Sequence, residues 1–185
     1  MAGTFYNLTH LQVAAKVPTP VYSDINYAVS FEPTIEQDSE TMNADGTKAV
    51  VAQGPPEGGG SIGFGSLNLT TMGVMTGGTV SNSGTAGTAI TRLEIKGNYN
   101  PPSLVLVAWL PNVDGNQASA GVRITLPNAK LTMPSASFGQ ETWSEFSADL
   151  KFVADTPGNM LIWEDLATAP TFTAGVIPTN ITPPV

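Results

Sequence analysis

Two stretches of the chain alternate apolar and polar residues with a period of two, which is typical of a β-strand buried on one face. In the first, residues 25–36, the apolar positions are Ile25, Tyr27, Val29, Phe31 and Ile35. In the second, residues 140–154, one face carries Thr142, Ser144, Phe146, Ala148, Leu150 and Phe152. We therefore predict two strands that pack on a core through one face and present polar side chains on the other.

Further patterns predict more elements of the same mainly β structure. Residues 104–110 are apolar at every position, which predicts a central strand buried on both faces. The apolar residues of 160–166 are predicted to pack around Trp163. Shorter alternating runs predict strands at 61–70, 88–96, 122–126 and 130–133.

One short helix is predicted at residues 70–78. Thr70 or Thr71 would cap its start, and Gly77 or Gly78 would end it. Its buried stripe would be Leu69, Met72 and Met75.

Three segments lack this alternation and divide the chain. Residues 17–20, Val-Pro-Thr-Pro, must be extended because a residue that precedes proline is pushed out of the helical region. Residues 37–60 predict a long, mobile hairpin or loop with Asp45-Gly46 as its tight turn. The predicted division is an N-terminal arm at 1–24, a β domain at 25–166 that includes the loop 37–60, and an extended C-terminal arm at 167–185.

The composition favours a structural protein over a catalyst. The 185 residues include one histidine and no cysteine, so the chain has no disulfide and few of the side chains that serve catalysis and metal binding. Charged residues are 12%, against about 25% in typical soluble domains. A surface this poor in charge is typical of a subunit that faces other subunits, and a monomer coated with Thr and Ser is the alternative. We predict no catalytic, cofactor-binding or metal-binding residue.

The net charge of −8 bears on partners. The seven Lys and Arg residues are scattered, whereas binding to phosphate backbones needs clustered cations. A wall of like charge would instead let a polyanion slide past without sticking. No apolar run approaches the ~18 residues of a membrane helix, and residues 1–23 lack the pattern of a secretion signal. We expect a soluble protein made in a cytosol.

Two glycine-rich motifs overlap at residues 58–63. Residues 59–63 match the G-x-S-x-G of hydrolases, but that motif needs a later histidine, and His10 precedes it. The G-x-G-x-x-G match at 58–63 is not followed by the long helix of a dinucleotide site. We interpret the segment as a flexible glycine linker before a strand, and His10 as a satisfied or solvent-exposed side chain.

Carboxylates gather on the polar faces of the two best-defined strands. Glu32 and Glu36 share a face of the first, and Glu141, Glu145 and Asp149 share a face of the second. Like charges opposed on a sheet destabilise it, so they are kept where they are wet or useful. An acidic face that lines a water-filled channel between subunits fits this arrangement.

Two other interpretations of the acids stay open. The first is an ordinary solvated strand face. The second is the acid pair of a glycoside hydrolase, for which Trp143 and Trp163 would supply the aromatic walls of a pocket.

The order of the segments carries a resemblance. A strand ending in Val29-Ser30-Phe31-Glu32-Pro33 follows the N-terminal arm, and then come the long loop, a glycine-rich strand and the helix at 69–77. A hairpin at 88–110 that turns at Asn100-Pro101-Pro102, a late strand at 138–153 and a Pro-rich C-terminus complete the order. Over nearly the whole chain this order, composition and turn chemistry resemble the major tail tube proteins of long, non-contractile-tailed bacteriophages, in particular those infecting actinobacteria.

The resemblance implies a β-sandwich or barrel of two packed antiparallel sheets with one short flanking helix. Six copies would form a ring, and rings would stack through loops and arms into a tube whose acidic bore conducts DNA. The partners implied are other copies of the chain, tail terminator and tail tip proteins and a tape measure protein, and DNA passes without specific binding. The protein would be made in the host cytoplasm and reside in the virion. The family has no catalytic residues and no cofactor.

Residue roles follow from the resemblance as hypotheses. The channel-lining set is Glu32, Glu36, Glu141, Glu145 and Asp149. The inter-ring loop set is Asp38, Glu40 and Asp45. The alternative functions are another virion shell component, such as a capsid decoration or capsid β-sandwich, and, less favoured, the acid-pair glycoside hydrolase.

Overall fold

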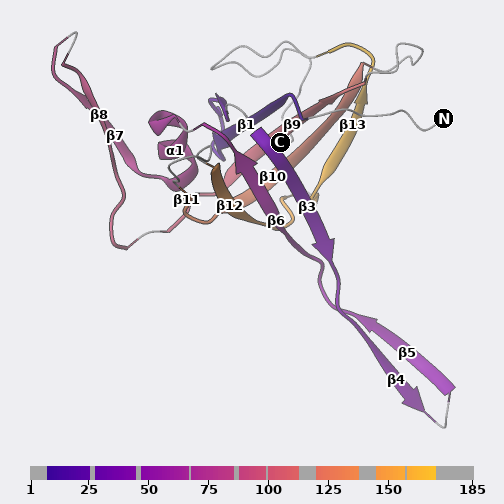
Figure 1. Cartoon of the computed structure of the whole chain (residues 1–185). Helices are drawn as coiled ribbons and strands as arrows, with labels where there is room; N and C mark the ends of the chain where they lie inside the picture. Colours follow the sequence, from indigo (N-terminus) through magenta and orange to yellow (C-terminus); the bar gives the residue numbers. More distant parts are fainter. Residues whose placement is uncertain are drawn as a thin grey trace.

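The protein is mainly β with one short helix, as the sequence predicts (Figure 1). The computed structural model describes residues 8–25, 28–44, 47–66, 68–85, 88–98, 100–112, 120–137, 145–156 and 158–169. Within these ranges, no helix has the length and apolar character needed to cross a membrane.

One large antiparallel sheet forms the body, with its described strands in the order β2-β1-β9-β10-β12-β6-β3. What we call the β9 half consists of β1 (His10–Ala15), β2 (Ser23–Asp24), β9 (Leu104–Pro111), β13 (Ile162–Leu166) and the first part of β10 (Gly121–Leu131). What we call the β6 half consists of β3 (Ala28–Glu36), β6 (Glu57–Phe64), β11 (Ser135–Ser137), β12 (Glu145–Phe152) and the end of β10.

Strand β10 joins the two halves. Its residues 121–125 pair with β13, and its residues 129–131 pair with β12. Between them the register shifts at Leu126 and Ala129, around Pro127, which has no N–H to donate to a ladder. The break predicted at Pro127-Asn128 is therefore an irregularity inside one continuing strand, and the sheet folds over there into two packed layers.

The core lies between the two halves. Alternate residues of β9 enter it, and the residues between them form a second buried cluster with Tyr22 on the far side of that sheet. The prediction of a central strand buried on both faces is thus confirmed. In the β6 half the rings of Phe64 and Phe146 stack with their centroids 5.7 Å apart. The largest fully buried apolar side chains are Phe64, Phe152, Leu11, Ile62, Met75, Leu104, Leu106, Leu126, Leu131, Leu150 and Val13.

The N-terminal segment differs from the arm predicted at 1–24. Residues 10–15 form β1, which pairs along its whole length with β9 and buries Leu11 and Val13 in the core. The reason is that β9, apolar on both faces, needs a neighbouring strand on each side. From residue 10 onward this segment therefore belongs to the folded body.

Helix α1 (Leu69–Thr76) lies where a short helix was predicted, with different details. Asn68 caps it, because its side-chain oxygen accepts a hydrogen bond from the Thr70 N–H at 2.8 Å, so neither predicted threonine is the cap. Gly77 ends it in the left-handed conformation at φ 67°, as predicted. Of the predicted stripe, Met75 is fully buried and Leu69 is exposed.

Two hairpins project from the body in opposite directions (Figure 1). Strands β4 (Ser39–Ala44) and β5 (Thr47–Gln53) form the hairpin predicted within 37–60, and the predicted turn Asp45-Gly46 lies outside the described residues. Strands β7 (Thr79–Ser83) and β8 (Ile90–Glu94) form the second. No described side chain of either hairpin belongs to the buried core.

The β7–β8 hairpin corrects one prediction. Residues 88–110 were expected to form a hairpin by themselves. Instead β8 pairs with β7, because both edges of β9 are occupied by β1 and β10. The register pair Val80 and Leu93 lies against the helix at Gly73, where a Cβ would sit 2.5 Å from Val80.

Candidate functional site

The outer face of the β6 half is the candidate site, and β6 lies at its centre. Ser61 on β6 is in register with Glu32 on β3 and with Asp149 on β12. Residues directly opposite each other on neighbouring strands share a face, so the two acids and the serine form one row across the sheet. The two acid-bearing strands were predicted to be possible neighbours, and the structure places β6 between them.

Parallel rows lie on either side of this one. One carries Ser30, Gly63, Ser147 and Ser135, and there the hydroxyls of Ser135 and Ser147 lie 2.9 Å apart. Two residues along the strands in the other direction, about 7 Å away, lie Thr34, Gly59, Lys151 and Lys130. A last row pairs Glu36 with Glu57. The face therefore combines small residues with rows of charged side chains.

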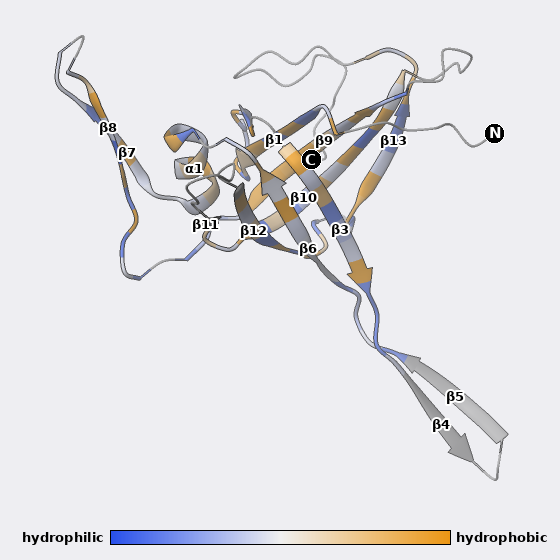
Figure 2. Ribbon diagram, viewed as in Figure 1, coloured by the Kyte–Doolittle hydropathy of each residue, from blue (hydrophilic) through white to orange (hydrophobic). Residues whose placement is uncertain are grey.

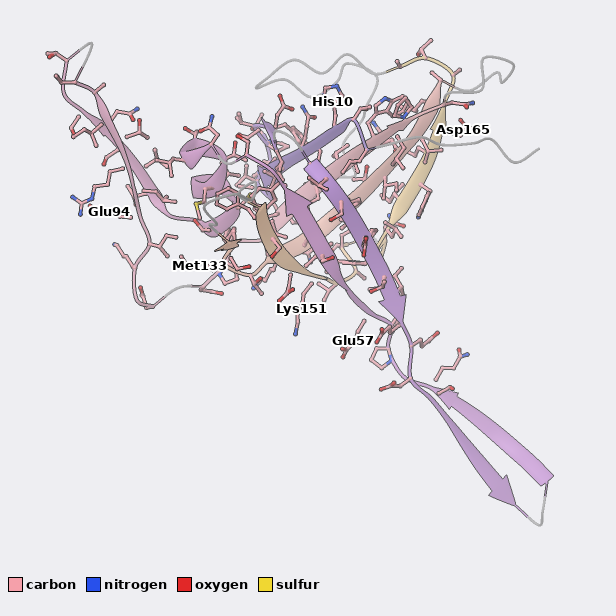
Figure 3. All side chains as sticks on the ribbon, in the orientation of Figure 1. His10, Glu57, Glu94, Met133, Lys151 and Asp165 are labelled. Carbon is pink, nitrogen blue, oxygen red and sulfur yellow. The ribbon has the colours of Figure 1, made fainter. Side chains whose placement is uncertain are left out.

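The charged side chains of this face are exposed. Glu32, Glu36 and Asp149 all reach solvent, in agreement with the prediction that they lie on polar strand faces. Lys151 points away from the body below β12, and Glu57 lies near the base of the β4–β5 hairpin (Figure 3). Figure 2 shows hydrophilic and hydrophobic positions following one another along the ribbon of β3.

The glycines of β6 make this face possible. Residues 58–60 were interpreted as a flexible linker, but they form strand pairs with both β3 and β12. Gly58 leaves room for the ring of Phe152, which a Cβ would approach within 2.3 Å. Gly60 has φ +149°, and a Cβ there would lie 2.1 Å from the Glu32 carbonyl oxygen. Close packing therefore explains the glycine run.

The structure adds residues that the sequence reasoning missed. Glu57 was overlooked because it precedes the supposed linker, and Lys130 and Lys151 were overlooked because nothing local reveals that they are partners. Their positions on one face follow from long-range register. Alternation within each strand would have placed each side chain outward, but not beside the others.

Strand β3 also departs from the predicted alternation. A register shift between Ala28 and Ser30 turns Val29 outward, so that it is 65% exposed, while Ala28 packs on the core. Ile35, near the end of the strand, is exposed as well. The bulge thus moves Val29 to the surface, and Ile35 is a second predicted core residue that is exposed on the edge strand.

The remaining predicted site residues are only partly described. Glu141 and Asp45 lie outside the described residues, and so do the side chains of Glu40 in β4 and Glu145 in β12. Asp38 is exposed at the base of the first hairpin, where its carbonyl oxygen accepts a hydrogen bond from the Gly54 N–H at 2.8 Å.

The other chemical candidates find little support in the arrangement. Ser61 lies in mid-strand rather than at a strand-to-helix turn, so its motif does not form a nucleophile elbow. Trp163 is 62% exposed on β13, in the other half of the sheet, and is not the centre of apolar packing that was predicted. Trp143 lies outside the described residues. His10 is exposed on β1.

No group of three or more potential metal ligands occurs among the described residues. One hollow of about 240 Å³ lies between the end of α1 and the segment after β8. It is lined by Thr76, Gly77, Gly78, Thr79, Glu94, Ile95, Lys96, Asn98 and Asn100. None of the acids in the candidate face borders it.

A second group of polar side chains is buried on the outer face of the β9 half. Arg123, whose side chain is 4% exposed, donates from Nε to Glu164 at 2.7 Å and also from Nη2 to the same oxygen. Gln12 donates to Asp24 at 2.7 Å. Burial raises the pKa of the Tyr22 phenol, and the positive charge of Arg123 opposes that rise. This group holds the layer together and offers no open cleft.

Comparison with known proteins yields no family. No family model matches the chain, and no curated protein sequence matches it significantly.

Proposed function

We propose that this chain is a structural subunit that self-assembles into stacked rings, six copies to a ring, and so forms a phage tail tube through which DNA passes. The observation that carries the proposal is the outer face of the β6 half. Glu32, Asp149, Glu36 and Glu57 lie on one exposed sheet surface, where they outnumber the two lysines Lys130 and Lys151.

The physical argument concerns what such a face can do. A pocket that binds a small molecule is concave and largely apolar, whereas this surface is an exposed, polar sheet face. Its four acids against two lysines leave a net negative charge, which repels a polyanion. A wall of this kind suits passage better than binding.

The projecting hairpins support the assembly part of the proposal. The β4–β5 and β7–β8 hairpins extend beyond the core, and an isolated two-stranded hairpin is marginally stable in water. Such elements gain stability by packing on a neighbour. Asp38 lies at the base of the first hairpin and Glu40 is in β4. In this proposal these two residues lie between rings, together with Asp45, which is outside the described residues.

The first test is the form of the purified protein in negative-stain electron microscopy. We expect uniform tubes of constant bore. Closed shells or isolated small oligomers would favour the alternative of a capsid or decoration subunit, and monomers at high concentration would contradict the proposal.

The second test concerns the acidic face. We expect tubes of Glu32→Lys with Asp149→Lys to bind DNA fragments, with an affinity that falls steeply as salt rises, because clustered cations release counterions from DNA. The control is Glu94→Lys with Asp165→Lys, which makes the same charge change at exposed acids away from this face. Equal DNA binding by both variants would show that the face does not line the bore.

A further inference from the structure

Two pairs of like charges lie directly opposite each other on the outer face of the β6 half. Glu36 on β3 is in register with Glu57 on β6, and Lys130 on β10 is in register with Lys151 on β12. All four side chains are exposed. Like charges in this position destabilise a sheet, so each pair costs the isolated subunit some stability.

Neither pair is compensated within the described part of the chain. The ion pairs there join Arg92 to Glu94 and Arg123 to Glu164, and none of the four residues takes part. Lys130 and Lys151 are also the two cations of the described residues that stand opposite each other on neighbouring strands. Within the described residues, neither pair therefore has an ion-pair partner in its own subunit.

The two pairs lie in neighbouring rows of the same face, and their outermost members lie on its two outer strands. The acid pair is on β3, which ends the described sheet order, and on its neighbour β6. Val29 and Ile35 of β3 are exposed as well. The lysine pair is on β12 and on the end of β10, where the sheet folds over. Glu57 and Lys151 are diagonal neighbours, since Lys151 is opposite Gly59. Glu36 and Lys130 lie on the outer strands and differ in sign, so this face is complementary to a copy of itself placed beside it.

We infer that a second copy of this chain docks head to tail on this face, with the Glu36–Glu57 pair of one copy beside the Lys130–Lys151 pair of the next. Such a contact uses different surfaces on the two partners, so it repeats and closes into a ring when the rotation allows. The inference rests on the proposed function for the self-association that it requires, and it names the residues that set the direction of the contact.

A polyanion is the competing occupant of the lysine pair. The lysine row lies about 7 Å from the acid row of Glu32 and Asp149, and about 7 Å on its other side from the row of Glu36 and Glu57. These acids repel phosphates from both sides. A second copy brings carboxylates to the lysines and at the same time removes the repulsion within its own acid pair.

The test is a charge swap on the full-length protein. One variant carries Glu36→Lys and Glu57→Lys, a second carries Lys130→Glu and Lys151→Glu, and a third carries all four changes. Sedimentation velocity over a range of concentrations and salt measures assembly. We expect each double variant to raise the concentration needed for assembly about tenfold, since surface ion pairs are each worth up to about 1 kcal/mol. The four-fold variant should return to within about threefold of the wild type.

Matched controls separate the contact from net charge. Asp165→Lys with Asn159→Lys and Ala167→Lys makes the same charge change as the first double variant, and Lys16→Glu with Lys96→Glu makes that of the second, all at exposed sites off this face. We expect both controls to assemble at the wild-type concentration. Circular dichroism and thermal unfolding verify that every variant is folded.

The outcomes distinguish this inference from the proposed function. Double variants that assemble like the wild type, or a four-fold variant that remains as defective as the worse double variant, overturn the inference. If the lysine variant assembles normally but its tubes lose contact with DNA, the lysines meet phosphate and the inference fails while the tube stands. Charge-dependent oligomers that never form tubes support the inference and remove the proposed function.

Discussion

The outer faces of the two sheet halves carry polar residues at equivalent alternate positions, but their environments are opposite. On the β6 half, Glu32 and Asp149 are exposed and lie on either side of Ser61. On the β9 half, Gln12, Arg123 and Thr125 are buried, and Arg123 is paired with Glu164. Polar alternation along a strand shows which residues point away from the core, but what covers that outward face decides whether they meet water.

The difference has consequences for stability. A polar group withdrawn from water costs free energy unless it is hydrogen-bonded, and Gln12 Oε1, Arg123 Nη1 and Thr125 Oγ1 are buried with no hydrogen-bond partner among the described residues. On the exposed face water satisfies such groups. Changes in the β9 half should therefore affect folding, whereas changes on the outer face of the β6 half should affect what the protein contacts.

The largest expected effect comes from disrupting the pairing of β3 with β6 in the candidate face. Gly60→Ala places a Cβ 2.1 Å from the Glu32 carbonyl oxygen at a φ that side chains rarely adopt, so β3 and β6 must separate. We expect a loss of roughly 3 kcal/mol in unfolding free energy. Gly59→Ala is the matched control, because its nearest atoms lie at 3.9 Å, and it should unfold at nearly the wild-type denaturant concentration. Equal stability of the two variants would contradict the close packing of β6.

The next effect concerns the buried ion pair of the β9 half. Glu164→Ala leaves Arg123 buried without its partner, and we expect a loss between about 1 and 3 kcal/mol in urea unfolding. The loss is smaller than for a fully buried pair because the Glu164 side chain is 39% exposed. Arg123→Met combined with Glu164→Leu should recover much of it. The neighbouring Asp165→Ala is the exposed control, and a loss there as large as at Glu164 would argue against the pair.

A pH dependence probes the same buried layer. Because burial raises the pKa of Tyr22 above its ordinary 10.0, the unfolded chain gives up this proton at lower pH than the folded chain does. Stability from this group is full below pH 10 and is lost as pH rises through the folded pKa. Urea unfolding between about pH 8 and 11 measures the loss. Tyr22→Phe should flatten that part of the profile, and an unchanged slope would show that the phenol ionises freely.

These contrasts show how far local patterns reach. The strands at 25–36 and 104–110, the hairpin within 37–60 and the end of α1 at Gly77 follow from alternation and turn chemistry within a few residues. Strand β1 was missed because its alternation covers only residues 10–13 within a segment interpreted as an arm, and it exists because β9 needs a second neighbour. The glycines of β6 read locally as a linker, since the Phe152 ring that they accommodate lies nearly a hundred residues away.

The candidate face, too, has features that local patterns predict and features that they do not. The outward direction of Glu32, Glu36 and Asp149 was predictable from the sequence, because period-two alternation determines the face within one strand. Their common row with Ser61, and the like-charged pairs of Glu57 and Lys151, depend on the register between strands far apart in sequence. Register is set by the packing of the opposite, apolar face, which no local pattern of charges reveals.

The smallest expected effect completes the comparison. Glu32→Gln with Asp149→Asn removes two charges from the exposed face without changing its shape, and unfolding free energy should change by less than about 0.5 kcal/mol. In the proposed tube, the same variant should retain DNA fragments more strongly than the wild type at low salt, because less negative charge repels the phosphates. A loss above about 1 kcal/mol would mean that these acids support the fold, as Glu164 does in the β9 half. Near-neutral stability with altered DNA retention would instead mean that the two faces differ in purpose, since residues that leave folding unchanged are free to act on what passes outside the subunit.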